Sequence, residues 1–359
     1  MTAALGWMPK AQAQQAPPRA PVLVGAQVHG SFIIAHTPAI KHLAVSHPTG
    51  FEVNVQRQTN GSQPWHAWYR YPRVGVAFTY YDYHNPTLGR SYAAGIYLSK
   101  AVWRRARQEV HARLGSGLAY FPQGFDAATN HRNTIISSRF NAIIQLRAEY
   151  DVALTSHWGA LLALGLNHYS NGATTKPNFG INLPTVSVGL NYHGQRPWRP
   201  LSPPAPGPDP ADLGRTRVSL SATAGLKQHG ESDPRRYLVN SITVSASRRV
   251  GRKSTLTAGV EGFLDRSLTA QLRDTARTTD RLPDVRKAGL YLGHELLFGR
   301  FAFVSHLGVY LYNPYKSNNF YYERLGLKYQ ITEHLFSSLD LKVHRGSADV
   351  IECRLGVRL

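Results

Sequence analysis

The chain has 359 residues, a length that suits either two ordinary soluble domains or one large β-barrel. Lys and Arg (41) outnumber Asp and Glu (21), and the formal net charge of +20 favours a polyanionic partner, either a phosphorylated lipid or a nucleic acid. No apolar run approaches the ~20 residues of a membrane-spanning helix, and the single cysteine, Cys353, excludes an internal disulfide.

Residues 1–20 resemble the end of a secretory signal peptide. Ala11-Gln12-Ala13 matches the small-x-small pattern of a signal cleavage site, and a polar segment that contains proline follows it. The charged start and most of the apolar stretch of a complete signal are missing. We therefore predict a truncated, signal-like and disordered segment over residues 1–20.

Residues 21–359 read as a succession of β-strands separated by turn residues. Runs of roughly ten to thirteen residues alternate between apolar side chains and small or polar ones, which is the period of a strand with two different faces. No segment longer than a turn or two shows a helical period. The predicted strands lie near residues 22–35, 49–58, 74–84, 89–100, 109–121, 139–152, 157–170, 183–193, 216–227, 237–248, 254–265, 286–297, 301–312, 319–330, 335–344 and 350–359.

The alternation is clearest in the last two predicted strands. Each has leucine and valine on one face and mostly charged side chains on the other: Leu339, Leu341 and Val343 against Asp340, Lys342 and His344, then Leu355, Val357 and Leu359 against Arg354, Gly356 and Arg358. Such strands suit a wall between lipid and water, and their length exceeds the ~5–6 residues usual in soluble sheets but fits the ~9–11 of a transmembrane strand. The predicted fold is all-β: a transmembrane antiparallel β-barrel of about 14–16 strands in a bacterial outer membrane.

Loop lengths agree with a barrel of this kind. If the N-terminus lies in the periplasm, the connections from odd to even strands lie at the cell surface and should be long. Segments 122–138 and 266–285 are long in those places. The exception is the proline-rich connection 194–215, which should be short. We interpret it as a stiff spacer between residues 21–193 and additional strands over 216–359, which keeps open an eight-stranded barrel plus a second β unit.

The most informative stretch begins with the strand predicted over residues 157–170. A period of two places seven side chains on one of its faces: Trp158, Ala160, Leu162, Leu164, Leu166, His168 and Ser170. This face is apolar until its end, so we expect it to contact lipid. His168 and Ser170 then leave the lipid-facing surface where the strand reaches the outer leaflet.

His168 and Ser170 form a candidate catalytic pair. Residues two apart on a strand point to the same side and lie ~6.6–6.8 Å apart at Cα, a gap that an imidazole and a hydroxyl can close. His168 can then act as a general base for a Ser170 nucleophile. Asn182 shares the lipid-facing parity of the returning strand and can orient the imidazole, as asparagine does in Cys-His-Asn enzymes. His-x-Ser alone is a weak motif, because such pairs at a barrel rim are usually interfacial polar residues.

The residues HYSNG and, after them, KPNFGIN resemble the motif of the lipid A 3-O-deacylases, PagL-like outer-membrane esterases also called acyloxyacyl hydrolases. The segments HPTGFEVNVQRQT, YPRVGVAFTYYDY, LGSGLAYFPQGFD and NTIISSRFNA look like the longer, multi-strand forms of that family. The resemblance covers roughly residues 22–193, and the C-terminal half matches only as generic barrel sequence. It implies an esterase whose Ser-His site lies on the lipid-facing surface and removes the 3-O acyl chain from lipid A of lipopolysaccharide.

The resemblance also assigns roles to residues of the motif. Ser170 matches the nucleophile of the family and His168 its base. Asn171 and Asn178 match asparagines of the motif; the latter is associated with the oxyanion hole, and Gly180 joins them as an expected oxyanion or substrate contact.

The third member of the triad is left open by the sequence. The best-known members of the family have a glutamate fourteen positions after the histidine, where this chain has Asn182. A neutral amide can fix the imidazole tautomer, but it does not stabilise the imidazolium as a carboxylate does. Asp126, in the surface loop 122–138, is the alternative acid, although an aspartate in a polar loop is more often a turn residue.

The expected reaction requires no cofactor, and the sequence shows no metal-ligand spacing among its histidines, which include His29, His36, His42, His47, His84 and His131. Arg132, Arg139 and Lys176 lie near the expected outer rim, where they can contact lipid phosphates, although a solvated loop charge is the commoner role. Two rival functions remain: a non-catalytic barrel, such as a porin or a structural protein, and a basic nucleic-acid-binding β protein.

Overall fold

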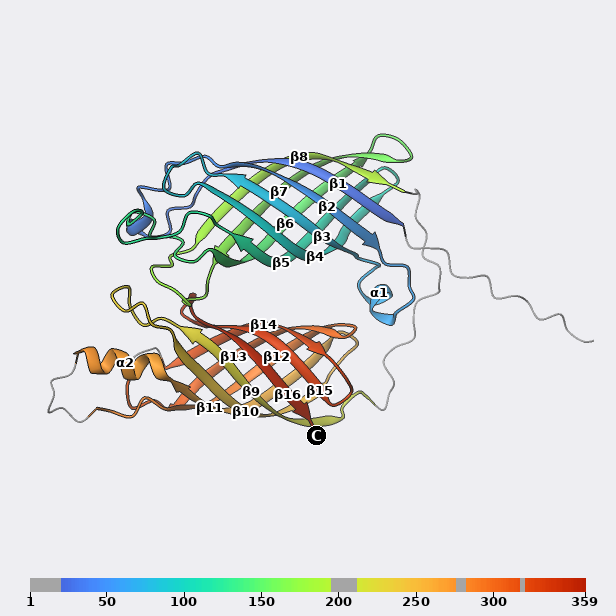
Figure 1. Ribbon diagram of the computed structural model, residues 1–359. Helices are drawn as coiled ribbons and strands as arrows, with labels where there is room; N and C mark the ends of the chain where they lie inside the picture. Colours follow the sequence, from blue (N-terminus) through green and yellow to red (C-terminus); the bar gives the residue numbers. More distant parts are fainter. Residues whose placement is uncertain (1–20, 195–211, 276–281, 317–319) are drawn as a thin grey trace, which may run out of the picture.

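A computed structural model of the chain describes residues 21–194, 212–275, 282–316 and 320–359. Sixteen strands in these residues close into two separate antiparallel barrels of eight strands each. The two barrels lie side by side (Figure 1). The signal-like segment predicted over residues 1–20 and most of the proline-rich connection 194–215 lie outside the described residues.

The first barrel consists of β1 to β8, and each strand pairs with its neighbours along the chain. It closes because β1 pairs with both β2 and β8, for example through Val28 opposite Phe51 and Val188. The strands are β1 (Val22–Ser31), β2 (Thr49–Gln58), β3 (Arg73–Asp82), β4 (Arg90–Arg105), β5 (Gln108–Tyr120), β6 (Phe140–Ala153), β7 (Trp158–Ser170) and β8 (Ile181–His193).

The second barrel consists of β9 to β16 and closes where β16 pairs with β9, for example at Leu355 opposite Ala222. Its strands are β9 (Thr216–Lys227), β10 (Tyr237–Arg249), β11 (Ser254–Asp265), β12 (Lys287–Phe298), β13 (Phe301–Tyr312), β14 (Tyr321–Gln330), β15 (Leu335–His344) and β16 (Ser347–Arg358).

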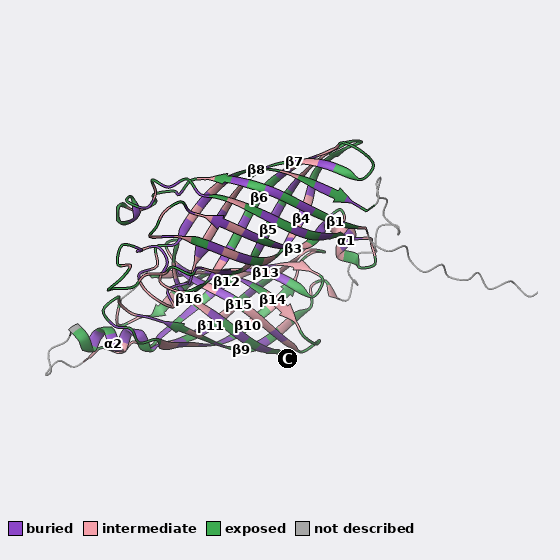
Figure 2. Cartoon of the chain, turned by 45° about the horizontal axis from the view of Figure 1, so that its top comes forward, coloured by how far each residue is buried: buried purple, intermediate pink, exposed green. Residues whose placement is uncertain are grey.

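Both barrels have apolar side chains outside and polar side chains inside, which is the arrangement of a barrel whose solvent is lipid. Exposed and buried residues alternate along the strands (Figure 2). Inside the first barrel, Glu52 is fully buried and accepts contacts from Arg113 at 2.7 Å and Arg147 at 3.1 Å. Inside the second, Arg324 is fully buried and contacts Glu261 at 2.7 Å. Because a charge buried without a partner is costly, acidic and basic side chains alternate across each lumen.

The connections distinguish the two ends of the barrels. The long connections from odd to even strands gather at one end, together with α2 (Arg266–Thr275), whose Ser267 N–H donates to Asp265 at 2.9 Å. The opposite end has mostly short turns, with α1 (Pro64–Trp68) as the exception between β2 and β3. A 3-10 turn, η1 (Pro38–Ile40), lies in the connection from β1 to β2. Among the described residues, no helix is long and apolar enough to cross a membrane.

A buried apolar cluster fills the loop end of the first barrel. Aromatic and aliphatic side chains from several strands and loops meet there, including Tyr81, Tyr83, Phe121, Ile135, Ile136, Tyr169, Ile181 and Leu183. This cluster ties the connections from β1 to β2 and from β5 to β6 to the ends of β7 and β8. It gives the loop end of β7 a rigid base, on which a site can be held.

The structure confirms the predicted fold class, an all-β antiparallel barrel protein. The strands close as two barrels of eight, the arrangement that the sequence kept open as the alternative to a single barrel of about 14–16 strands. Strand number and alternation are the same in both arrangements, so the pattern along the chain does not distinguish them. The ten-residue helix α2 was not predicted; it covers part of the connection 266–285.

Candidate active site

The loop end of β7 places two polar side chains on the outward face of the first barrel. His168 and Ser170 follow the exposed Leu164 on the same face, and both are half-buried. Tyr169, between them, points inward, is fully buried, and packs edge-on against Phe121 with the ring centroids 5.4 Å apart. This aromatic contact anchors the strand where the two outward side chains emerge from the apolar belt.

Asn182 lies beside His168 on the neighbouring strand. The register of β7 and β8 makes the two residues direct partners, and Nδ1 of His168 lies 2.7 Å from Oδ1 of Asn182. Because an amide oxygen only accepts hydrogen bonds, Nδ1 carries the proton in this arrangement. The other ring nitrogen, Nε2, then keeps a lone pair, which is the state that a general base requires.

The hydroxyl of Ser170 is surrounded by donors. Its Oγ accepts a hydrogen bond from the side-chain amide of Asn178 at 3.0 Å and from the backbone N–H of Gly172 at 3.1 Å. The Asn178 amide is oriented in turn, because its Oδ1 accepts the backbone N–H of Asn171 at 3.3 Å. Two N–H groups thus converge beside the candidate nucleophile, the arrangement that stabilises an oxyanion. Gly172 was not singled out from the sequence, since a backbone amide has no residue signature.

No hydrogen bond joins His168 to Ser170 within the described part of the chain, although the two side chains share one face. Ser170 Oγ is held instead by Asn178 and Gly172. The torsion that moves Oγ is rotation about the Cα–Cβ bond of Ser170. Catalytic hydrogen bonds are often long in unliganded enzymes and tighten when substrate binds.

Asn171 and Gly180 support the site without presenting side-chain donors to it. The buried Asn171 amide lies 3.0–3.1 Å from oxygens of Ser137, Ser138 and Thr175, so it holds the loop in place. The N–H of Gly180 donates to the carbonyl of Ile135 at 3.1 Å. A Cβ at Gly180 would lie 2.9 Å from the Tyr169 carbonyl and 3.1 Å from Cε1 of His168, and its φ of +75° favours glycine.

Asp126 makes hydrogen bonds within its own loop. Its carboxylate accepts the N–H and hydroxyl of Thr129 and the N–H of Ala128, at 2.8–3.0 Å. These hydrogen bonds, those of Thr129 first, lower the pKa of Asp126. No hydrogen bond links it to His168 in the residues that the structure describes. Its position is that of a turn-capping aspartate.

The candidate phosphate contacts differ in exposure. Arg132 and Arg139 are exposed at the loop end of the first barrel. Lys176 is half-buried and donates through Nζ to the carbonyl of His229 in the second barrel, at 2.9 Å. Burial lowers the pKa of Lys176. Its ammonium group is therefore engaged with the second barrel, whereas the two arginines face outward.

A second histidine, His36, extends the hydrogen-bond chain of the site. Its Nδ1 lies 3.3 Å from Nδ2 of Asn182, and its Nε2 lies 3.0 Å from the carbonyl of Phe179. In the sequence, His36 stands out only as one of several histidines without metal-ligand spacing. No spacing signal could have identified it, because it reaches Asn182 only when the barrel closes and brings the end of β1 beside β8, where Ile34 N–H donates to the Asn182 carbonyl.

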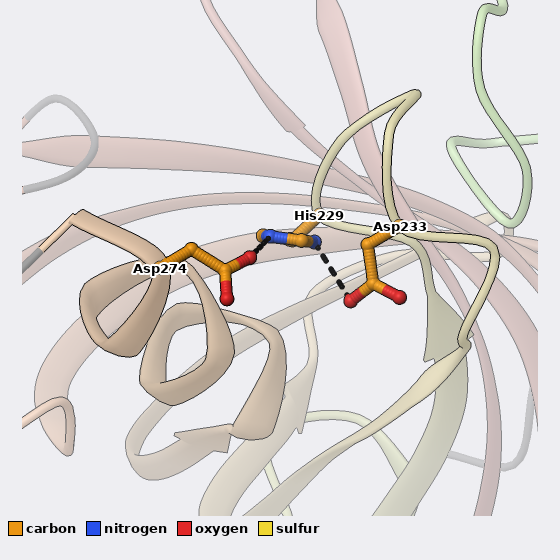
Figure 3. Close-up of side chains that lie close together, drawn as sticks. All are labelled: His229, Asp233 and Asp274. Carbon is orange, nitrogen blue, oxygen red and sulfur yellow. Dashed lines mark hydrogen bonds and ion pairs between the residues drawn. The ribbon is translucent and has the colours of Figure 1, made fainter.

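One group of possible metal ligands occurs among the described residues, in the second barrel: His229, Asp233 and Asp274, whose ligand atoms lie within 4.8 Å of one another. Figure 3 shows His229 between the two carboxylates, with Nε2 2.8 Å from Asp274 and Nδ1 3.4 Å from Asp233. Asp233 also binds Arg235 and Tyr237. An ion would take only one imidazole nitrogen, so the geometry fits a histidine held between two acids better than a metal centre.

Solved structures resemble the chain only distantly. Neisserial surface protein A is 15% identical, with 48% of this chain and 96% of that chain covered and a TM-score of 0.33. A porin mutant of Rh. blastica is 10% identical, with coverage of 94% and 99% and a TM-score of 0.19. An outer membrane protein of Acinetobacter baumannii is 8% identical, with coverage of 95% and 98% and a TM-score of 0.18. No curated protein matches the chain.

Two family models match the two barrels. Residues 49–191, from β2 to β8, match the model described as lipid A 3-O-deacylase (PagL). Residues 216–359, the second barrel, match the model described as acyloxyacyl hydrolase, C-terminal domain. The first match includes Ser170, His168 and Asn182. Since the two models together account for most of the chain, the protein belongs to the PagL family of lipid A deacylases of the bacterial outer membrane.

Proposed function

We propose that this protein is a serine esterase that hydrolyses the ester-linked acyl chain at the 3-O position of lipid A, with Ser170 as nucleophile and His168 as general base. One observation carries the proposal. His168 and Ser170 share the outward face of β7, where Asn182 binds the imidazole and Asn178 binds the hydroxyl. Those contacts supply an oriented base and oxyanion donors beside a hydroxyl on a lipid-facing wall.

In the first step, Ser170 Oγ attacks the ester carbonyl carbon while its proton passes to Nε2 of His168. The negative charge that develops on the carbonyl oxygen is bound by the Asn178 side-chain amide and the Gly172 N–H. In the structure, these two donors contact Ser170 Oγ. When the intermediate collapses, the bond to the sugar oxygen breaks and His168 returns its proton to that oxygen. Water then attacks the acyl-enzyme with His168 again as base, which releases the 3-hydroxy fatty acid and restores Ser170.

The surroundings of the pair suit an acyl chain. On the β6 side, the small Ala142 is the direct partner of Ser170, and Ile144 is the partner of His168. Ile144 is 39% exposed and Leu164 is 61% exposed, so an apolar strip continues from the site along the outer wall. A lipid tail in the outer leaflet can lie on this strip while its ester reaches Ser170. Phosphates of lipid A would then meet the exposed Arg132 and Arg139.

A non-catalytic porin is the rival function, and the lumens argue against it. Buried ion pairs cross both barrels, such as Arg113 with Glu52 and Arg354 with Asp340 at 2.7 and 2.8 Å. A water-filled channel would leave such side chains exposed. The polar contents of these barrels therefore favour closed scaffolds that present chemistry on their outer surface.

The test uses the full-length protein, folded in detergent and incubated with purified lipid A. Mass spectrometry of the products should show loss of one 3-hydroxy acyl chain, and fragmentation should assign that chain to the 3-O position. Ser170→Ala and His168→Ala should each lower the rate by a factor of at least roughly 10⁴, as loss of a triad member does in serine hydrolases.

The chain offers a matched control in Ser156 and His157. These residues form a Ser/His hydrogen bond of 2.9 Å in the turn at the opposite end of β7. Ser156→Ala should leave the rate unchanged. Near-full activity in Ser170→Ala would refute the assignment of the nucleophile, and release of a chain from another position would refute the 3-O specificity.

A further inference from the structure

A histidine outside the proposed triad lies against the Asn182 amide, on the side away from His168. His36, an exposed residue of the connection from β1 to β2, lies 3.3 Å from Asn182 Nδ2, while Asn182 Oδ1 lies 2.7 Å from His168 Nδ1. We propose that His36 is a positioning residue that fixes the orientation of the Asn182 amide and, through it, the tautomer of His168. The catalytic part of this inference rests on the proposed function.

The directions of the hydrogen bonds follow from one carbonyl group. The Phe179 carbonyl can only accept, so His36 Nε2, 3.0 Å away, carries the proton. In a neutral ring, Nδ1 of His36 is then an acceptor and must face a donor, which is Nδ2 of Asn182. The amide oxygen consequently faces His168, whose Nδ1 donates to it and whose Nε2 stays free for the proton of Ser170.

A second contact of His36 does not compete with this arrangement. The Ile34 carbonyl lies 3.3 Å from His36 Nδ1 and accepts the backbone N–H of His36 at 3.0 Å, but with the ring proton on Nε2 the Nδ1 atom has no proton to donate to it. Asn182 is thus the side chain that uses the Nδ1 lone pair. The backbone of the two segments is also joined, because Ile34 N–H donates to the Asn182 carbonyl at 3.1 Å.

An asparagine in this position needs such a partner, whereas a carboxylate does not. Both oxygens of a carboxylate accept hydrogen bonds, so either orientation fixes the same imidazole tautomer. An amide can turn over and present its NH₂ group, which selects the tautomer with the proton on Nε2 and so removes the base. In chymotrypsin-like proteases, replacement of the triad aspartate by asparagine lowers kcat by about 10⁴-fold for this reason. His36 supplies the contact that opposes the turned-over state here.

The first test compares His36→Ala with His42→Ala. His42 is an exposed histidine of the same connection, and its Nε2 bonds the Arg132 carbonyl at 2.8 Å, so it is a matched control that does not contact the triad. His36→Ala should lower kcat roughly 3- to 10-fold, the equivalent of one ordinary hydrogen bond, with KM unchanged. His42→Ala should leave kcat unchanged.

The double variant separates positioning from a general effect on the loop. In the Asn182→Glu background the third group has no orientation to fix, so adding His36→Ala should have no effect on kcat. An equal loss in both backgrounds would overturn the proposal, because it would show that His36 acts independently of the amide. No loss in the Asn182 background would overturn it as well.

A second readout does not depend on activity. Long-range ¹H–¹⁵N correlation spectra of the detergent-folded protein report which imidazole nitrogen of His168 carries the proton. The parent protein should show the proton on Nδ1, and His36→Ala should show a mixture of tautomers. An unchanged His168 spectrum in His36→Ala would refute the proposal even if Ser170→Ala showed that the proposed reaction is wrong.

A different set of contacts links the second barrel to the loop that carries Asn178. Gln228, buried at the end of β9, accepts the Lys176 N–H at 2.9 Å through Oε1 and donates its own N–H to the Ala173 carbonyl at 3.2 Å. Its Nε2 donates to the Asp233 carbonyl at 2.8 Å, which fixes the amide. A Cβ at Gly172 would lie 2.3 Å from Ile351 of β16, so the loop contacts the second barrel directly.

We also infer that the second barrel positions the oxyanion donors of the first, and that Gln228 is its positioning residue. Gln228 bonds the loop 171–180 on both sides, at Ala173 and at Lys176, between the candidate donors Gly172 and Asn178. The loop is therefore held at its centre by the neighbouring barrel. The second barrel then contributes to catalysis by positioning the loop, without supplying a reactive group.

Gln228→Ala should lower kcat roughly 3- to 10-fold with little change in KM, because it removes the side-chain contact with the Lys176 N–H while the backbone contact with the Ala173 carbonyl remains. Gln330→Ala is the matched control: Gln330 likewise donates to loop carbonyls, at the short-turn end of the same barrel. In the Asn178→Ala background, Gln228→Ala should add much less to the loss. Full additivity of the two losses, or no loss in Gln228→Ala alone, would overturn this inference.

Discussion

Replacing Asn182 by glutamate places a carboxylate beside His168, and the geometry of the site allows the size of its effect to be estimated. The hydrogen bond to His168 Nδ1 is 2.7 Å long, so the new group acts at contact distance if its oxygen takes the same place. A hydrogen bond to a charged partner is worth about 1.5–3 kcal/mol, against about 0.5–1.5 kcal/mol for a neutral one. Since the carboxylate stabilises the imidazolium that forms in the transition state, Asn182→Glu should raise kcat roughly 5- to 10-fold.

Asn182→Ala is the complementary change. It removes the neutral hydrogen bond and leaves the tautomer of His168 unselected. Loss of the hydrogen bond alone should lower kcat roughly 2- to 10-fold. Initial rates of acyl-chain release, measured by mass spectrometry on one lipid A preparation at saturating concentration, give kcat for each of the two variants. Migration on a gel with and without heating confirms that each variant is folded.

The assignment of Asn182 as the third member of the triad can be refuted by comparing Asp126→Asn with Asn182→Ala. If it supplied the third member of the triad, Asp126→Asn would be severely impaired and Asn182→Ala nearly silent. The hydrogen bonds of Asp126 to Thr129 and Ala128 instead predict a local effect on the loop and little change in rate. Equal, small losses in Asn182→Ala, Asn182→Glu and Asp126→Asn would mean that His168 and Ser170 act as a dyad.

Three further predictions concern the scaffold. The detergent-folded protein should give a β-dominated circular dichroism spectrum and heat-modifiable migration, and a helix-rich spectrum would contradict the fold. Gly180→Ala should reduce both stability and activity, because a Cβ there would lie 2.9 Å from the Tyr169 carbonyl at a φ of +75° and 3.1 Å from His168 Cε1; unchanged activity would show that the ring tolerates the contact. Glu261→Ala leaves the buried Arg324 with one carboxylate fewer and should destabilise the second barrel by about 3–5 kcal/mol, seen as unfolding at lower temperature on heated gels, whereas the exposed Glu231→Ala should not.

The fold class was readable from the sequence because a strand between lipid and a polar lumen must alternate at every second residue. Leu339, Leu341 and Leu355 showed this period, and the strands of the structure follow the predicted ranges closely, with β2 and β9 at the predicted bounds. How many strands each barrel contains is a different matter. Closure depends on which edges pair, β1 with β8 and β16 with β9, and each of those pairings joins residues far apart in the chain.

The residues of the candidate site also fall into two groups: those that the local sequence placed, and those that only the tertiary structure brought to the site. Period-two alternation alone placed His168 and Ser170 on one outward face, because that relation is local to one strand. The hydrogen bond between His168 and Asn182 needed only the register of the β7–β8 hairpin. By contrast, His36 reaches Asn182 only through closure of the barrel, and Gln228 reaches the loop 171–180 only because a second barrel lies against the first. Contacts between segments distant in sequence have no local pattern, and so only the tertiary structure decided which residues orient the pair that the sequence had already placed.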